Sequence, residues 1–183
     1  MGRIMQPIRD LALLEQIKDY LAKRDMRNWM LFVLGINTGL RISDLLPLRV
    51  RDAQQPFITL REQKTGKHRR IVVNDTLRAY VNYYLEYCDW LKPQDYMFES
   101  QIKGRPISTV QAYRIIREAG EAFGLESIGT HTMRKTFGYH FYKRTKDVAT
   151  LQLILNHSTP NITMRYIGII QDEIDDAMMG HSL

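Results

Sequence analysis

Six residues of this 183-residue chain have side chains and sequence contexts suited to attack on a phosphodiester without a metal. Two are arginines, which can neutralise phosphate oxygens, and one is a tyrosine, which can supply a nucleophilic oxygen. A lysine and two histidines add groups that can donate or accept protons. In chain order, the six are Arg41, Lys64, His131, Arg134, His157 and Tyr166.

The two arginines are suited to the charge that this chemistry must overcome. The nonbridging oxygens of a phosphodiester repel a nucleophile, and their negative charge grows in the transition state. The guanidinium groups of Arg41 and Arg134 can each place two N–H donors on those oxygens. Lysine lacks this planar pair of donors, so an arginine-to-lysine change at either position is expected to be harmful.

The charge of the chain is unevenly distributed. The formal net charge is +6, but residues 171–183 contain four acids and no Lys or Arg, so residues 1–170 carry +10. Basic residues concentrate in Arg61–Arg70 and Thr130–Lys146. A polyanionic partner, most often a nucleic acid, is therefore expected, although a solvated basic surface has the same composition.

Composition also restricts the class of protein. A hydrophobic fraction of 44% is ordinary for a globular protein, and 183 residues can bury a core without crosslinks. Cys88 is the only cysteine, which excludes an intrachain disulfide and favours a reducing, cytoplasmic compartment. No apolar run approaches the roughly 20 residues that cross a bilayer, so no membrane partner is expected. Zinc-site and nucleotide-loop patterns are absent, so we expect neither a metal nor another cofactor.

Hydrophobic periodicity predicts a mainly α-helical fold with one small antiparallel β-hairpin. No linker or repeat divides the chain, so we expect a single domain with a core over residues 1–170 and an acidic C-terminal helix or tail over 171–183. The expected strands are Phe57–Arg61 and Arg69–Val73. The expected helices are Ile8–Leu21, Arg27–Thr38, a turn at Ser43–Leu48, a helix capped by Asp75 or Thr76 and running to Cys88, Ser108–Phe123, one from Thr130, one from Asp147 to Asn156, and Pro160–Tyr166.

The order and contexts of the six residues resemble the tyrosine recombinases, the phage integrase family, whose catalytic domain is related to type IB topoisomerases. In that family, arginine follows Thr-Gly-Leu, lysine lies in a β-hairpin, and His-x-x-Arg opens a helix. A histidine also precedes the tyrosine by about nine residues. This chain matches each of these positions, and the resemblance extends from about Ile8 to about Ile170. It implies the tyrosine recombinase catalytic-domain fold.

The resemblance also implies a role for each residue. Tyr166 would be the nucleophile, forming a 3′-phosphotyrosyl bond and releasing a 5′-hydroxyl, so that rejoining needs no ATP. His131 is expected to act as the general base. Lys64 is expected to protonate the leaving 5′ oxygen, with Lys67 as a competing candidate. His157 would hydrogen-bond the phosphate and help to position the tyrosine.

Other residues are expected to support the site or to hold DNA. Asp44 resembles the supporting carboxylate of the family, although a capping or surface role is an alternative. The expected partner is double-stranded DNA. The candidates for contacts with its phosphates are the basic residues Lys67, Arg69, Arg70 and Lys135.

The chain departs from the family pattern in two places. Asn156 stands where the family usually has glycine; asparagine tolerates a left-handed backbone, so the turn is expected to survive. Only about ten residues precede the first expected helix, so the chain reads as a stand-alone catalytic domain without the N-terminal core-binding domain, either naturally short or excised. The acidic tail is expected to pack on a neighbouring protomer in a dimer or tetramer on DNA, or else to fold back on its own domain. An accessory DNA-binding protein is a further candidate partner.

The function expected from the resemblance is site-specific DNA recombination. Two alternatives remain: a non-catalytic DNA-binding regulator on the same fold, and DNA relaxation of the topoisomerase IB kind. The intact set of six residues argues against the regulator, and the small size and family context favour recombination over relaxation. The target sequence, and the choice among integration, excision, inversion and resolution, do not follow from the sequence.

Overall fold

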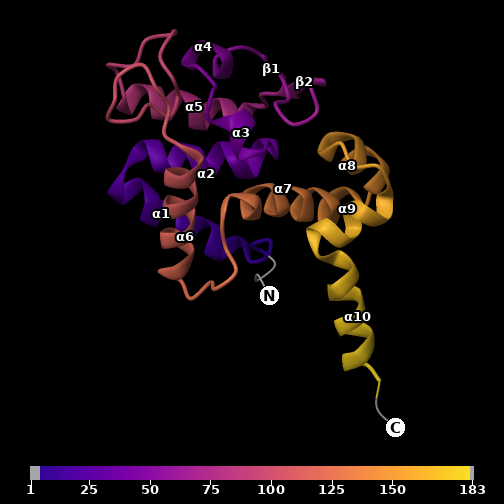
Figure 1. Cartoon of the computed structure of the whole chain (residues 1–183). Coiled ribbons are helices and arrows are strands. Elements are labelled where there is room, and N and C mark those ends of the chain that lie inside the picture. Colours follow the sequence, from indigo (N-terminus) through magenta and orange to yellow (C-terminus); the bar gives the residue numbers. More distant parts are fainter. Residues whose placement is uncertain (1–4, 182–183) are drawn as a thin grey trace.

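The computed structural model describes residues 5–181, apart from the side chains of residues 176 and 177 in the acidic tail. This part of the chain is mainly helical, with one two-stranded antiparallel sheet, as predicted (Figure 1). None of its helices is both long and apolar enough to cross a membrane. In chain order, the elements are α1 (Leu11–Arg24), α2 (Met26–Thr38), α3 (Ile42–Leu45), α4 (Val50–Ala53), β1 (Phe57–Arg61), β2 (His68–Val72), α5 (Asp75–Tyr87), α6 (Thr109–Glu121), α7 (Thr130–Thr145), α8 (Val148–Leu155), α9 (Pro160–Ile167) and α10 (Ile169–Met179).

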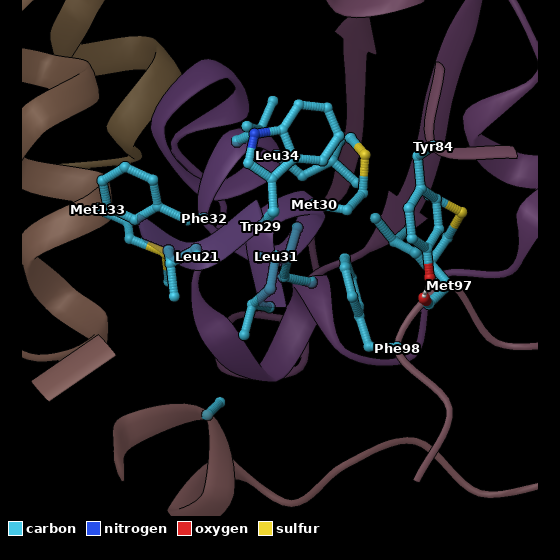
Figure 2. Packing of buried hydrophobic residues seen from close by; sticks show 14 of the residues in the cluster. Leu21, Trp29, Met30, Leu31, Phe32, Leu34, Tyr84, Met97, Phe98 and Met133 are labelled. Carbon is cyan, nitrogen blue, oxygen red and sulfur yellow. Dashed lines mark hydrogen bonds between the residues drawn. The ribbon is translucent and has the colours of Figure 1, made fainter. Parts of the chain in front are cut away.

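Helix α2 runs through the main hydrophobic core. Met30 and Phe32 on this helix are fully buried, and α1, α5 and α7 all pack against it. Figure 2 shows the side chains of α2 together with Tyr84 of α5 and Met133 of α7 in the same core. Burial of each large apolar side chain contributes roughly 1.5–3 kcal/mol. The C-terminal end of α2 is therefore held firmly, and this end leads into the pocket described below.

Strands β1 and β2 form the expected hairpin. Phe57 pairs with Val72, and Arg61 pairs with His68, so β2 begins one residue earlier than expected. In the turn, the Glu62 N–H donates to the Lys67 carbonyl (2.9 Å), and the Gly66 N–H donates to the Glu62 carbonyl (2.8 Å). The turn is thus a closed, hydrogen-bonded loop rather than an open one.

Helix α1 begins three residues later than its apolar pattern suggested, at Leu11 instead of Ile8. Asp10 caps the helix, because its side chain accepts hydrogen bonds from the first N–H groups. Ile8 lies in an extended segment instead: its N–H donates to the Thr136 hydroxyl (2.9 Å), and its carbonyl accepts from Nε2 of His140 (2.9 Å). The segment before α1 is therefore bound to α7 and takes no part in a helix.

The local structure differs from the sequence prediction in two further places. Helix α5 is capped by Asn74, and not by Asp75 or Thr76, because the extended backbone of Asn74 lets its side chain accept from the Leu77 N–H (2.9 Å). Helix α4 was not expected, because four residues are too few to show a helical period. The other expected helices are confirmed, with ends that differ by a few residues.

Helices α7, α8 and α9 enclose a second, smaller hydrophobic cluster. Leu151, Leu155 and Ile167 are fully buried in it. Gly138 on α7 permits the close approach of α9, because a Cβ at this position would lie 2.7 Å from Cγ2 of Ile167. Helix α9, which carries Tyr166, is therefore packed directly on the helix that carries His131 and Arg134.

Helix α10 projects away from the rest of the molecule (Figure 1). Gly168, with φ of 83°, separates it from α9 in a left-handed turn that glycine adopts without strain. Arg9, in the segment before α1, forms an ion pair with Asp172 in the first part of α10 (2.7 Å). The N-terminal segment thus helps to set the direction in which α10 leaves the body.

We expect Gly138→Ala to destabilise the protein by about 1–2 kcal/mol net. The new methyl group collides with Ile167, and this overpacking outweighs the roughly 1 kcal/mol that alanine gains over glycine in a helix. Urea unfolding would measure the loss as a lower midpoint. Arg144→Ala, at an exposed position of the same helix, is the matched control and should change the free energy of unfolding by less than about 0.5 kcal/mol. A Gly138→Ala protein as stable as the wild type would contradict the close packing of α7 and α9.

Candidate active site

The backbone at the end of α2 sets the position of Arg41. Gly39 ends the helix in a left-handed conformation (φ 61°, ψ 20°), and a side chain there would collide with the ring of Phe137. Arg41 follows in an extended conformation (φ −70°, ψ 150°) at the start of α3. The Thr-Gly-Leu-Arg sequence therefore makes a sharp turn that brings Arg41 beside the hairpin and α7.

A pocket of about 200 Å³ lies where α3, the β-hairpin and α7 meet. Four of the six predicted residues line it: Arg41, Lys64, His131 and Arg134. Lys64 comes from the exposed tip of the hairpin, and His131 lies at the open edge. Residues far apart in the sequence are thus brought together around one small pocket.

Arg134 is buried and is held by two backbone carbonyls from different elements. One guanidinium nitrogen donates to the carbonyl of Gly39, and Nη2 donates to the carbonyl of Leu155 at the end of α8 (2.6 Å). Burial and the nearby charge of Arg41 lower the pKa of Arg134 to about 10, while Tyr166 opposes the shift. Arg134 therefore remains charged at neutral pH and connects the end of α2 to the end of α8.

Glu62 is a buried carboxylate in this site that the sequence did not reveal as functional. Its Oε2 lies 3.0 Å from Nη1 of Arg41, and its Oε1 accepts from Arg69 (2.8 Å). Burial alone would raise the pKa of Glu62, but hydrogen bonds from Thr65 and Arg69 and the charge of Arg41 outweigh it and lower the pKa to about 2. The only signal in the sequence was that Glu62 is the lone acid in the basic segment Arg61–Arg70.

The contact between Arg41 and Glu62 is a charge pair without hydrogen-bond alignment. Nη1 of Arg41 is buried, yet it has no hydrogen-bond partner among the residues that the structure describes. A buried donor of this kind is costly unless a ligand atom accepts from it. Arg41 therefore retains an N–H group for an anion that enters the pocket.

Tyr166 lies at the same site, on α9 of the same chain. Its hydroxyl is 3.4 Å from Nδ1 of His131, and its ring meets the His157 ring edge to face, with centroids 5.0 Å apart. Burial raises the pKa of Tyr166, whereas the charges of Arg134 and Arg41 oppose the increase. The phenol is therefore protonated at neutral pH and lies next to a group that can take its proton.

Both histidines are held in the neutral form by their surroundings. Burial, followed by the charges of Arg134 and Arg41, lowers the pKa of His157 to about 4, and burial and the same arginines lower that of His131. Nδ1 of His157 is 3.0 Å from the hydroxyl of Thr163, a fully buried residue that sequence reasoning missed. A neutral His131 has a free lone pair, which a general base requires.

Asp44 is buried, which excludes the surface role considered for it. Its Oδ1 accepts from the N–H of Gln63 (2.8 Å), next to Glu62 at the start of the hairpin turn. Its Oδ2 is buried without a hydrogen-bond partner among the described residues. Asp44 therefore ties α3, next to Arg41, to the hairpin that carries Lys64.

The four candidates for DNA contacts are placed in different surroundings. Arg69 is turned inward to Glu62, and Lys135 is buried with Nζ 4.9 Å from the centre of the Tyr166 ring. Arg70 is exposed and lies over the ring of Phe57, while exposed Lys67 is bonded to Asn156. Arg69 and Lys135 thus contact residues of the site, Glu62 and Tyr166, rather than open solvent. Across residues 5–181, no group of three His, Cys, Asp or Glu side chains is placed to hold a metal ion.

Comparison with known proteins places the sequence in one family. Residues 10–171 match the sequence profile described as the phage integrase family. A protein of Bacillus subtilis (strain 168), described as the probable integrase/recombinase YoeC, is 53% identical over 170 residues, which cover 92% of each chain.

Two solved structures share the fold. The crystal structure of XerA recombinase superposes with a TM-score of 0.73 and 21% identity, covering 97% of this chain and 65% of that one. The Tn1549 transposon integrase in complex with transposon right end DNA gives a TM-score of 0.66 and 20% identity, covering 87% and 60%. At these identities the likeness is one of fold, and this chain spans about two thirds or less of either protein.

We expect His157→Gln to weaken the dependence of stability on pH. Between about pH 6.5 and 4 the unfolded chain binds a proton at His157 and the folded chain does not, so wild-type stability falls as the pH is lowered through this window. Because the ring is only half-buried, the expected loss is on the order of 1–2 kcal/mol. Urea unfolding at pH 7.5 and 5.0 would measure this loss of stability. Both pH values lie above the range in which Glu62 titrates, so Glu62 contributes little to the difference.

The matched control is His68→Gln, which removes an exposed histidine from the hairpin and should keep the wild-type difference between the two pH values. A His157→Gln protein that loses as much stability as the wild type between pH 7.5 and 5.0 would show that another group causes the loss.

Proposed function

Because the chain belongs to the phage integrase family, the tyrosine recombinases, we propose that it is a site-specific DNA recombinase that breaks and rejoins strands through Tyr166. The family resemblance drawn from the sequence is thereby confirmed. The observation that carries the proposed reaction is the position of the Tyr166 hydroxyl, 3.4 Å from His131 and beside the pocket lined by Arg41, Lys64 and Arg134. The DNA complex of the Tn1549 integrase supports DNA as the substrate.

In the proposed cleavage step, the Tyr166 oxygen attacks the scissile phosphorus and the bond to the 5′ oxygen breaks. Nδ1 of His131 takes the phenolic proton, and Lys64 gives a proton to the departing 5′ oxygen. The products are a 3′-phosphotyrosyl ester and a 5′-hydroxyl. Attack of another 5′-hydroxyl on this ester reverses the steps and rejoins the strand, so the bond is conserved without ATP.

Arg41, Arg134 and His157 are proposed to hold the nonbridging oxygens. Arg41 brings the buried N–H without a hydrogen-bond partner, and Arg134 is fixed by two carbonyls, so little reorganisation is needed when charge develops on the phosphate. His157 can present N–H from Nε2 when the Thr163 hydroxyl donates to Nδ1 (3.0 Å) in place of the Thr159 carbonyl (3.3 Å). Such preorganised donors contribute roughly 10²–10³ in rate each in other enzymes.

The assembled pocket favours an enzyme over the non-catalytic regulator. A DNA-binding protein without catalysis needs no tyrosine beside a neutral histidine and two arginines, yet these groups lie together here. DNA relaxation of the topoisomerase IB kind uses the same chemistry and differs in whether two duplexes are held together. We propose that the projecting helix α10, which has exposed apolar side chains, provides a surface for such pairing, and this favours recombination.

We expect the wild-type protein to become covalently linked to nicked duplexes of random sequence in EDTA, and Tyr166→Phe to reduce this adduct by at least about 1,000-fold, because the nucleophilic oxygen is removed. Denaturing gels of SDS-quenched reactions with labelled DNA would measure the adduct. Tyr83→Phe, which changes an exposed tyrosine on α5, is the matched control and should keep wild-type adduct. A DNA gel shift with no adduct from the wild type would favour the regulator instead.

We further propose that α10 joins protomers on DNA by packing on a second copy of the chain. Three apolar side chains on this helix are exposed: Ile174 by 49%, Met178 by 66% and Met179 by 88%. They lie on a helix that contacts its own body mainly through its first turns and α9. Exposed apolar groups on a projecting helix indicate a partner surface.

Replacing Ile174, Met178 and Met179 together by serine should weaken assembly on DNA at least about tenfold and leave covalent attachment to isolated nicked duplexes within about threefold, because Asp172 and its pairing with Arg9 are retained. Native gels and sedimentation of DNA complexes would measure assembly. Ile102→Ser, at an apolar loop position exposed by 64%, is the control for loss of a surface side chain. Unchanged assembly by the triple variant would exclude exchange of α10 between protomers.

A further inference from the structure

The tip of the β-hairpin is bonded to the turn between α8 and α9 through Asn156. The side-chain oxygen Oδ1 of Asn156 accepts from Nζ of Lys67 (2.8 Å), and its Nδ2 donates to Oε2 of Glu62 (3.2 Å). Glu62 and Lys67 stand at the opposite ends of the hairpin turn, 94 and 89 positions before Asn156 respectively. One amide therefore connects two parts of the site that no backbone hydrogen bond joins in the described structure.

The backbone at Asn156 would suit glycine better. The residue ends α8 in a left-handed conformation (φ 50°, ψ 48°), so the turn survives without glycine, as expected. Glycine adopts this conformation without strain, whereas asparagine only tolerates it. Asparagine at this position instead forms two side-chain hydrogen bonds to the hairpin, which glycine could not form.

These bonds bear on Lys64 because it lies between their two partners. Lys64 is two residues after Glu62 and three before Lys67, in a turn already closed by backbone bonds between Glu62 and Lys67. The side chains of the turn are otherwise exposed, except that of Glu62. Holding both ends of the turn against α8 therefore restricts where the Lys64 amine can lie relative to His131 and the pocket.

We propose that Asn156 is a positioning residue that holds the hairpin over the active site and so places Lys64 for proton transfer to the leaving oxygen. This rests on the proposed function, in which Lys64 is the general acid. The connection also joins the hairpin to the residues that follow Asn156, namely His157 and the helix carrying Tyr166. The Asn156 side chain thereby fixes the proposed proton donor, Lys64, relative to the proposed nucleophile, Tyr166. A glycine in this turn would lack the side chain that does so.

Asn156→Gly tests this directly, because it relieves the backbone and removes only the amide. Covalent attachment is timed in single turnover on two nicked duplexes, one with the ordinary 5′ oxygen at the scissile bond and one with sulfur in its place. A thiolate leaves without a proton, so the loss caused by a displaced general acid disappears on the sulfur substrate. We expect Asn156→Gly to be about tenfold slower on the oxygen substrate and within about twofold of wild type on the sulfur substrate.

Two variants frame the result. Lys64→Ala should show the same pattern with a larger loss on oxygen. Lys146→Gly is the matched backbone control, because Lys146 is the other non-glycine residue with positive φ among the described residues (φ 55°), and its amine lies over the Tyr142 ring and not at the hairpin. It should keep the wild-type rate on both substrates. A loss with Asn156→Gly that is equal on oxygen and sulfur, or no loss on either, would overturn the proposal.

Hydrogen exchange distinguishes failure of this proposal from failure of the proposed function. Amide protons of the turn, including those of Glu62 and Gly66, should exchange at least about fivefold faster in Asn156→Gly than in wild type, and at the wild-type rate in Lys146→Gly. If the wild type forms no adduct on either duplex, the proposed reaction is contradicted. The hydrogen-exchange measurement would still test whether Asn156 holds the hairpin turn. Unchanged exchange in Asn156→Gly would itself exclude Asn156 as the residue that holds the hairpin.

Discussion

The active site depends on one buried carboxylate among several buried cations. Glu62 is 1% exposed and lies against Arg41 and Arg69, whose side chains are also largely withdrawn from water. Arginines this close repel one another, and the lowered pKa of Arg134 shows that burial in this field is unfavourable to the charged form. Removing one member of a buried ion pair costs roughly 3–5 kcal/mol, because the other charge is left without compensation. Glu62 therefore holds the arginines together before a phosphate adds its own negative charge.

Backbone carbonyls hold the buried guanidinium of Arg134 in place, as the Glu62 carboxylate holds that of Arg41. The carbonyls come from Gly39 at the end of α2 and Leu155 at the end of α8, and a helix end leaves such carbonyls without partners. The same bonds therefore satisfy two elements and orient the guanidinium. As a result, the position of Arg134 depends on how α2, α7 and α8 pack, and core packing and site geometry cannot vary independently.

Burial and the nearby cations also set the protonation states of the two histidines and of Tyr166. Burial, followed by the charges of nearby cations such as Arg134, keeps His131 and His157 neutral, which suits their proposed roles as proton acceptor and as ring N–H donor. Burial keeps Tyr166 protonated until a base takes its proton. Tyr166, the proposed nucleophile, is placed at the site by its own chain, because Gly138 lets α9 lie directly on α7 and Tyr166 reaches His131 within one molecule. Helix α10 then leaves the body just after α9, so the proposed assembly between protomers would act close to Tyr166.

The sequence by itself determined the chemical groups, the mainly helical character and the hairpin. These follow from local patterns: the Thr-Gly-Leu-Arg turn, the helical spacing of apolar residues, and caps such as Ser108 and Asp147, whose partners lie three residues away. Only the tertiary structure decided where α1 begins, since Ile8 is bound by α7 rather than by its own helix. It alone also revealed Glu62, Thr163 and the contacts of the Asn156 side chain, and it turned Arg69 and Lys135 inward. The physical reason is that a charged or polar side chain takes its function from the partner that compensates it, and for most of these residues that partner lies on another element, far away in the sequence.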